Sequence, residues 1–197
     1  MNYYKVLCED EKHRKMKYKT GLNVDVLKWY PHGDCTPGGI YFSREDIFEF
    51  FSYGPWIRKV TIPKKTAIYK NPGGRDKWKS HQVILGKRRK ICTKVIKSLI
   101  KEGATVRYTI LEWAVIHGCP SLISFLIPNF STRDIMDALD TAVDNNIAKS
   151  AKVLIPLVSK KYCKKLVVKF DMNYKDCKLS KNMLKLFEPY LKKKRYQ

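Results

Sequence analysis

The sequence predicts an α+β N-terminal domain followed by an all-α array of short helix pairs. Over residues 1–90, short apolar runs alternate with Gly- and Pro-containing turns, a pattern typical of short strands. From residue 91 onward, apolar residues recur with a helical period, and the pattern repeats along the chain. The chain has 197 residues, 44% of them hydrophobic, which excludes global disorder.

Several short strands around one helix are expected in the N-terminal domain, residues 1–90. Ser43 is expected to cap the helix, with Asp46 three residues later in the capping-box position. Gly54-Pro55 is expected to end this helix. The candidate strands are residues 3–7, 21–27, 40–42, 56–62, 67–69 and 83–85.

The helical segment repeats internally at an offset of 28 residues. Leu111-Glu112-Trp113-Ala114 recurs as Leu139-Asp140-Thr141-Ala142. Gly118 and Asn146 match at the same offset, and both residue types readily take a left-handed backbone conformation. Each unit is therefore expected to be a short helix, a tight turn and a second helix, in a stacked array whose units bury their apolar faces against their neighbours.

The expected boundaries follow this offset. They are a half unit at 91–104, units of about 109–130 and 134–158, a worn unit at 160–190 and a basic tail at 191–197. The segment 166–171 is compatible with either a strand or a helix.

One repeat carries a family signature. Thr109-Ile110-Leu111-Glu112-Trp113-Ala114 resembles the ankyrin T-P-L-H-x-A motif, with Ile for Pro and Glu for His. The resemblance covers roughly residues 91–190 and implies ankyrin-like, degenerate helix pairs that recognise proteins. The offset of 28 is shorter than the usual period of about 33, which implies trimmed loops between the units.

The N-terminal half resembles a domain that precedes ankyrin repeats in proteins of giant amoeba-infecting DNA viruses. The matching segments are 19–24, 35–42 and 78–86. The chain is therefore identified as a short member of the ankyrin-repeat proteins of giant viruses, the mimivirus group. This resemblance implies a viral origin and assigns no chemistry.

A second resemblance concerns Gly38 to Ser43, which is similar to the G-I-Y-F-A segment of poly-ADP-ribose polymerases. It implies that Tyr41 and Tyr53 line a nicotinamide pocket. That family also needs a His on an earlier strand and a late Glu; here His13 falls in a charged loop and Gln82 stands near the Glu position. Without a carboxylate to stabilise the developing positive charge, catalysis is disfavoured, and an inactive architecture is the alternative.

His32-Gly33-Asp34-Cys35 brings an imidazole, a carboxylate and a thiol within four residues. A structural zinc needs four convergent ligands, and no second Cys/His pair lies nearby. We therefore expect Asp34 to cap a turn and Cys35 to pack inward, with no metal and no cofactor. The six cysteines, widely spread and without a C-x-x-C pair, are expected to be reduced.

Positive charge is concentrated on either side of the helical segment. The formal net charge is +22, from 40 basic and 18 acidic residues. This charge supports an alternative function, non-specific contact with nucleic acid, without a motif for sequence readout. The candidate residues are Lys87, Arg88, Arg89, Lys90, Lys160, Lys161, Lys164, Lys165, Lys192, Lys193, Lys194 and Arg195.

The leading hypothesis is a non-enzymatic protein-interaction module. Trp113, His117 and the connection Ser131-Thr132-Arg133 are the candidate contacts to an unidentified protein, with a host factor as one source. Trp113 has a second interpretation, in which it fills a gap between stacked units. Since no apolar run reaches the length of a signal peptide or a membrane span, we expect an intracellular protein of the infected host, in the cytoplasm or nucleus, without membrane contact.

Overall fold

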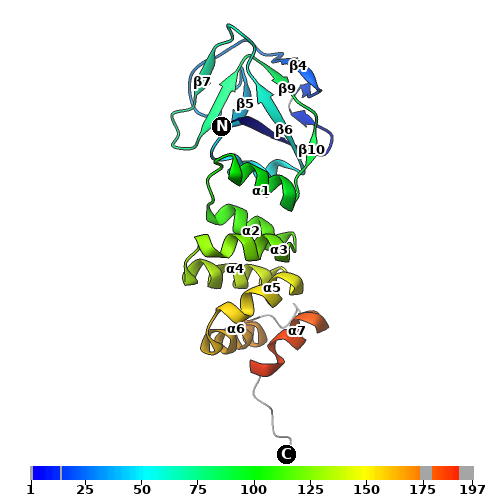
Figure 1. Cartoon of the computed structure of the whole chain (residues 1–197), viewed down its shortest axis with the longest axis vertical. Helices are drawn as coiled ribbons and strands as arrows, with labels where there is room; N and C mark the ends of the chain where they lie inside the picture. Colours follow the sequence, from blue (N-terminus) through cyan, green and yellow to red (C-terminus); the bar gives the residue numbers. More distant parts are fainter. Residues whose placement is uncertain (1, 14, 174–178, 191–197) are drawn as a thin grey trace, which may run out of the picture. The chain divides into compact units, whose positions relative to one another are not determined.

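The computed structural model describes residues 2–13, 15–173 and 179–190, with the side chains of 169–173 left out of the description. The chain divides into two compact units, Met1–Val106 and Arg107–Gln197. Strands dominate the first unit and helices the second (Figure 1).

The first unit is built on an antiparallel sheet of eight strands in the order β4-β9-β6-β1-β5-β8-β7, with β10 paired to β6. A separate hairpin pairs β2 with β3. The strands are β1 (Tyr3–Leu7), β2 (Lys12–His13), β3 (Met16–Lys17), β4 (Gly21–Val24), β5 (Ile40–Ser43), β6 (Trp56–Thr61), β7 (Ile68–Lys70), β8 (Lys77–Ser80), β9 (Gln82–Leu85) and β10 (Arg89–Lys90).

Strand β6 organises the sheet. One of its edges pairs with the whole of β1, from Tyr3 opposite Val60 to Leu7 opposite Trp56. Its other edge is shared, because β9 pairs near Val60 and β10 pairs near Trp56. A cluster of buried apolar residues fills the core of this unit: Leu7, Tyr18, Ile40, Phe42, Val60, Val83 and Leu85.

The helix expected after Ser43 is a 3₁₀ helix, η1 (Ile47–Tyr53), and Ser43 does not cap it. Ser43 is the last residue of β5, and its hydroxyl donates to the Asp76 carbonyl at 2.6 Å. The Asp46 side chain accepts from the Asp76 backbone N–H at 2.9 Å. These bonds to the segment before β8 use both side chains, so the predicted capping box is wrong.

Helix α1 (Thr93–Lys101) belongs to the same unit as the sheet. The Glu102 carboxylate, just after the helix, accepts from Asn2 Nδ2 at 2.8 Å and from the Tyr4 hydroxyl at 2.7 Å. The Thr105 N–H donates to the Glu45 carbonyl at 2.8 Å. These bonds attach the segment that follows α1 to the sheet unit.

The second unit contains six α-helices and three short 3₁₀ helices within its described residues. They are α2 (Tyr108–Ile116), α3 (Pro120–Leu126), η2 (Ile127–Asn129), α4 (Thr132–Asp144), α5 (Ala148–Leu154), η3 (Ile155–Leu157), α6 (Lys160–Asn173), α7 (Lys181–Phe187) and η4 (Glu188–Tyr190). The open segment 166–171 is therefore helical. No helix in the described ranges is long and apolar enough to cross a membrane.

The 28-residue repeat is visible in the backbone hydrogen bonds of this unit. Gly118 and Asn146 both have a left-handed backbone, with φ of 58° and 56°. The residue after each turn donates to the preceding helix, Cys119 N–H to the Ala114 carbonyl at 3.0 Å and Ile147 N–H to Ala142 at 2.7 Å. The two left-handed turns expected from the sequence are confirmed.

The expected fold class is nevertheless wrong. The N-terminal part is an antiparallel sheet domain of eight strands whose helix near Ser43 is 3₁₀. The helices that follow do not clearly form an all-helical ankyrin array. Helix α1, needed as the first half unit, is part of the sheet unit, and no strand pairs between the helix pairs in the described residues of the second unit.

Candidate functional site

The exposed side of α2 carries a stacked aromatic pair. The Trp113 and His117 rings lie 4.0 Å apart between centroids and 16° from parallel. The His117 ring nitrogen Nδ1 lies 2.8 Å from the Trp113 carbonyl oxygen, which holds the imidazole in place. Ile116, 42% exposed, is the neighbouring apolar side chain. The opposite side of the helix is buried, so the half-buried Trp113 and the exposed Ile116 and His117 form its outward face.

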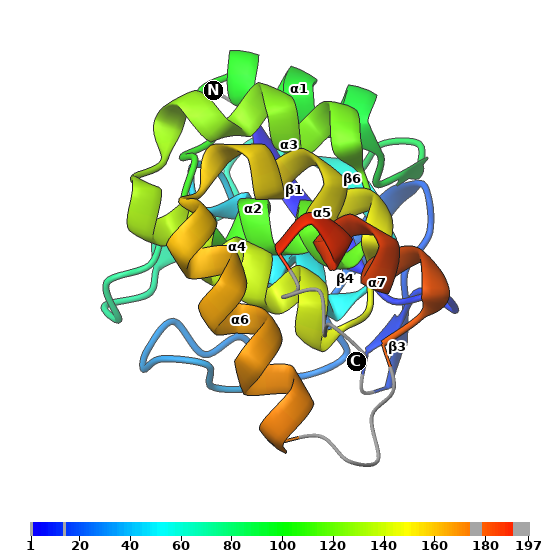
Figure 2. The same cartoon turned by 90° about the horizontal axis from the view of Figure 1, so that it is seen from below.

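The corresponding positions in and just after α4, 28 residues after Trp113, Ile116 and His117, are Thr141, Asp144 and Asn145. Asp144 is exposed, and the half-buried Asp137 and Asp140 share its side of the helix by their spacing. Helix α4 packs against α2, and it is joined to α6 by the Tyr162 hydroxyl, which donates to Asp140 Oδ1 at 2.5 Å (Figure 2). Burial and this bond raise the pKa of Tyr162. Of the three aspartates, Asp144 is exposed, Asp140 is bonded to α6 and Asp137 is paired with Arg133. The joined outer sides of α2 and α4 are therefore apolar on α2 and carry an exposed carboxylate on α4.

Ser131 and Arg133 make contacts at the start of α4, whose first residue is the exposed Thr132. The Ser131 hydroxyl accepts from the Asp134 N–H, and the Asp134 carboxylate accepts from the Ser131 N–H, a complete capping box. Arg133 pairs with Asp137 at 3.2 Å. The ring contact between Tyr108 and Phe130 places the start of α4 beside the start of α2. Trp113 and His117, in contrast, lie toward the end of α2.

The basic clusters differ in how far their side chains are engaged in contacts within the chain. Lys160, Lys161, Lys164 and Lys165 are exposed and share one side of α6 by their spacing.

The cluster at Lys87–Lys90 is partly engaged within the sheet unit. The Arg88 guanidinium lies 4.5 Å from the Trp56 ring, and Arg89 lies 5.7 Å from the Tyr4 ring. The run 192–195 lies outside the described residues.

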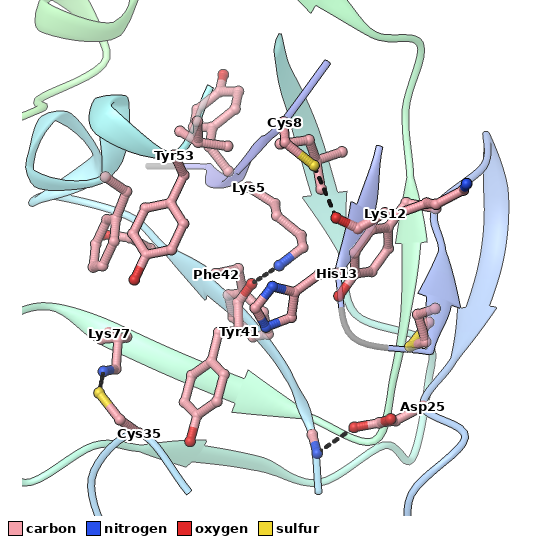
Figure 3. Close-up of a pocket in the computed structure, with 18 of the residues that line it drawn as sticks. Lys5, Cys8, Lys12, His13, Asp25, Cys35, Tyr41, Phe42, Tyr53 and Lys77 are labelled. Atoms are coloured by element: carbon pink, nitrogen blue, oxygen red, sulfur yellow. Dashed lines mark hydrogen bonds between the residues drawn. The ribbon is translucent and has the colours of Figure 1, made fainter. Parts of the chain in front are cut away.

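The sheet unit contains a pocket of about 370 Å³ beside β1 and β5. Figure 3 shows the Lys5 side chain reaching into it between Tyr53, Tyr41 and His13. The Lys5 ammonium donates to the Tyr41 carbonyl at 2.9 Å and lies 4.7 Å from the Tyr18 ring centroid. Since Lys5 is only 9% exposed, desolvation lowers its pKa to about 8.

Tyr41, Tyr53 and His13, which the polymerase resemblance singled out, all line this pocket. Gln82 does not; its side-chain amide donates to Thr66 Oγ1 at 2.9 Å. The lining contains one carboxylate, Asp25, whose oxygens accept from backbone N–H groups. The missing glutamate remains the argument against transfer chemistry.

The loop 32–35 is arranged differently from the expectation. Cys35 is exposed, has a left-handed backbone with φ of 54°, and accepts a hydrogen bond from Lys77 Nζ. Its expected inward packing is wrong. Hydrogen bonds from Lys77 and Asn71 lower the pKa of Asp34 to about 2. Among the described residues, no group of three or more His, Cys, Asp or Glu side chains is placed to hold a metal ion.

Sequence reasoning missed Lys5 as a site residue. The sequence did contain a signal, a lysine in the middle of the apolar strand Tyr-Tyr-Lys-Val-Leu. Because side chains alternate along a strand, Lys5 shares its side with Tyr3 and Leu7, which is not a polar side. Its pocket partners at 18, 41 and 53 are far away in sequence, so the cluster exists only in the fold.

Comparison with known proteins gives relatives from one virus. No family model and no solved structure matches the chain. Putative ankyrin repeat protein R229 of Acanthamoeba polyphaga mimivirus is 34% identical over 124 residues, covering 56% of this chain and 40% of the relative. Putative ankyrin repeat protein R868 is 22% identical over 169 residues, covering 73% and 84%. The uncharacterized protein R869 is 36% identical over 92 residues, covering 44% and 65%.

The chain thus spans less than half of R229 and most of R868. The resemblance to giant-virus proteins is confirmed, although the identities are modest. Several putative ankyrin repeat proteins of mimivirus are homologues of this chain.

Proposed function

We propose that the helical unit binds a protein partner through the joined exposed faces of α2 and α4. The names of the homologues, ankyrin repeat proteins, support a protein-interaction role. The observation that carries the proposal is the stacked pair of Trp113 and His117 beside the exposed Ile116. The role is non-enzymatic.

The stacked pair is suited to recognition for an energetic reason. Tryptophan is over-represented among residues that dominate binding energy, because it buries a large area with few rotatable bonds. Stacking on His117 already restricts the Trp113 ring, so less rotamer entropy is lost on binding.

The chemistry of the surface defines the class of partner. The chain has a net charge of +22, yet the outer side of α4 carries the exposed Asp144, with the half-buried Asp137 and Asp140 on the same side. An acidic group beside an apolar patch is complementary to a protein segment that presents a basic side chain next to apolar ones. The rest of the chain is positively charged and would repel a basic partner, which favours binding at the surface formed by α2 and α4.

The test is capture from nuclease-treated Acanthamoeba extract with the full chain, washed at about 0.15 M and then about 0.5 M salt. We expect a discrete protein to survive the high-salt wash and to be lost with Trp113→Ala. Phe125→Ala, which removes an aromatic side chain of 40% exposure from α3, is the matched control and keeps the partner. Retention by Trp113→Ala, with both variants folded by circular dichroism, contradicts the proposal.

A second candidate function rests on the four exposed lysines of α6. Lys160, Lys161, Lys164 and Lys165 could neutralise phosphates and bind nucleic acid without sequence preference. Such binding weakens steeply with salt, with a slope in log units close to the number of phosphates neutralised. Replacement of all four by Gln lowers that slope by about 3 to 4 if they are the contacts, and leaves it unchanged if they are not.

A further inference from the structure

The pocket of the sheet unit is shaped for a small molecule rather than for a protein chain. Its volume of about 370 Å³ lies within the usual range for small-ligand sites, about 300–1,000 Å³. Tyr18, Tyr41 and Tyr53 line the pocket, and Figure 3 shows the flat rings of Tyr41 and Tyr53 near the Lys5 side chain. Tyr53 is 62% exposed, so the pocket is open to solvent at that side.

A buried cation that forms no described ion pair lies in this pocket. The described contacts of the Lys5 ammonium are the Tyr41 carbonyl oxygen and the Tyr18 ring, and none of the ion pairs described for this unit includes Lys5. Asp25 lines the same pocket and attracts Lys5 electrostatically, without a described ion pair between the two. A buried charge without a paired countercharge is costly because it has lost its hydration. An anion that entered the pocket would remove part of this cost.

The neighbouring carboxylates form their described hydrogen bonds with groups other than Lys5. Arg58 lies directly opposite Lys5 across the β1–β6 pair, and its guanidinium is paired with Glu11 at 2.7 and 2.9 Å. The carboxylate of Asp25, which lines the pocket, accepts from the N–H groups of Gly39 at 2.6 Å and Leu27 at 3.1 Å. Lys5 therefore feels Asp25 as an electrostatic attraction, whereas Arg58 has a carboxylate in direct contact.

We propose that this pocket is a binding site for a small aromatic anion, a carboxylate or a phosphate, with the Lys5 ammonium as its ionic partner and the tyrosine rings around its apolar body. The site lies entirely in the sheet unit and is independent of the protein-binding surface. Lys12, Lys15 and Lys77 also line the pocket, which gives it a positive potential that attracts anions.

The test is calorimetric titration of the full chain with benzoate and with phenyl phosphate, and with benzyl alcohol as the uncharged counterpart. We expect saturable binding of at least one anion with a dissociation constant of about 1 mM or below, in keeping with so few ligand atoms. Benzyl alcohol should bind at least about tenfold more weakly, since it lacks the charge. The two anions distinguish a carboxylate site from a phosphate site.

Variants locate the binding. Lys5→Met keeps the length of the side chain, removes a buried charge that forms no described ion pair, and should weaken binding of the anion at least about tenfold without loss of fold. Lys64→Met, which removes an exposed lysine outside the pocket lining, is the matched control and should leave affinity unchanged.

If Lys5→Met does not fold, Tyr53→Ala decides, because the exposed Tyr53 ring contributes to the pocket wall and should be dispensable for folding. It should weaken the same anion. Failure of both anions to saturate, equal binding of benzyl alcohol, or unchanged affinity in the folded Lys5→Met and Tyr53→Ala variants overturns the proposal.

Discussion

Of the eleven buried polar or charged residues among the described residues, ten lie in the sheet unit and Ser150 alone lies in the helical unit. In the sheet unit these include charged groups: Lys5, Arg58 paired with Glu11, and Lys79. In the helical unit the buried residues are almost all apolar, and the Ser150 hydroxyl donates to the Val115 carbonyl at 2.7 Å.

The two units also differ in where their candidate functional side chains lie. A buried polar network costs free energy unless every member has a hydrogen-bond or charge partner. Such a network therefore favours one particular arrangement of the interior. The sheet unit has such an interior, and its candidate ligand group, Lys5, lies inside it. The helical unit has an apolar interior, and its candidate contacts, Trp113 and His117, lie on its surface.

The largest expected effect separates the two units. Glu11→Ala leaves the Arg58 guanidinium, with a side chain only 5% exposed, without its carboxylate. We expect the sheet unit to lose about 3–5 kcal/mol, and the helical unit to keep its protection, in hydrogen exchange resolved by mass spectrometry.

Asp10→Ala is the control, because the Asp10 side chain is 59% exposed and its pair with Lys12 is 3.8 Å long. Its loss should change the stability of the sheet unit far less than the loss of Glu11, because exposed ion pairs contribute little. An equal loss of stability in both variants would show that the buried Arg58–Glu11 pair contributes no more than the exposed pair, contrary to the prediction.

The second effect is the acid sensitivity of the sheet unit. Hydrogen bonds from Arg58, opposed in part by desolvation, lower the pKa of Glu11. A carboxyl whose pKa is lower in the folded state stabilises the fold above its unfolded pKa, about 4.3, and loses this contribution as the pH falls through the folded value. Chemical denaturation between pH 7 and 3 should show this loss for the wild type and a shallower one for Glu11→Gln.

The smallest effect tests whether Ser131 supports the helix or contacts a partner. Ser131→Ala removes the capping box of α4 and should destabilise the helical unit by about 1 kcal/mol in denaturant unfolding. Because its role is structural, capture of the partner should persist. Ser124→Ala, an exposed serine within α3, is the control and should leave stability nearly unchanged. Loss of capture with Ser131→Ala alone would return this residue to the binding surface.

The elements that were predicted correctly have strong local signals. The strand at Tyr3–Leu7 is confirmed, and its aromatic and β-branched residues favour a strand locally. The turns at Gly118 and Asn146 are confirmed because few residue types tolerate their backbone. In both cases, neighbouring residues alone determine the outcome.

The failures come from contacts between distant parts of the chain. Strand β8 (Lys77–Ser80) was missed because Lys79 looks like a surface residue. In the fold, the Lys79 ammonium is buried, donates to the His32 carbonyl at 3.0 Å, and lies 5.4 Å from the Tyr41 and Tyr69 rings. Such a partner set for a charged side chain has no local sequence pattern, and the pocket around Lys5 was missed for the same reason.

The most direct test of the proposed recognition surface is photo-crosslinking from within it. A benzoylphenylalanine at Asn145, the exposed residue just after α4 and 28 residues after His117, leaves the stacked pair intact and is compared with one at Ile68, which is 42% exposed on strand β7 of the sheet unit. After irradiation in Acanthamoeba extract at about 0.5 M salt, we predict a discrete crosslinked protein from position 145 and none from position 68. Crosslinks of equal yield from both positions, or from position 68 alone, would contradict partner recognition by the helical unit.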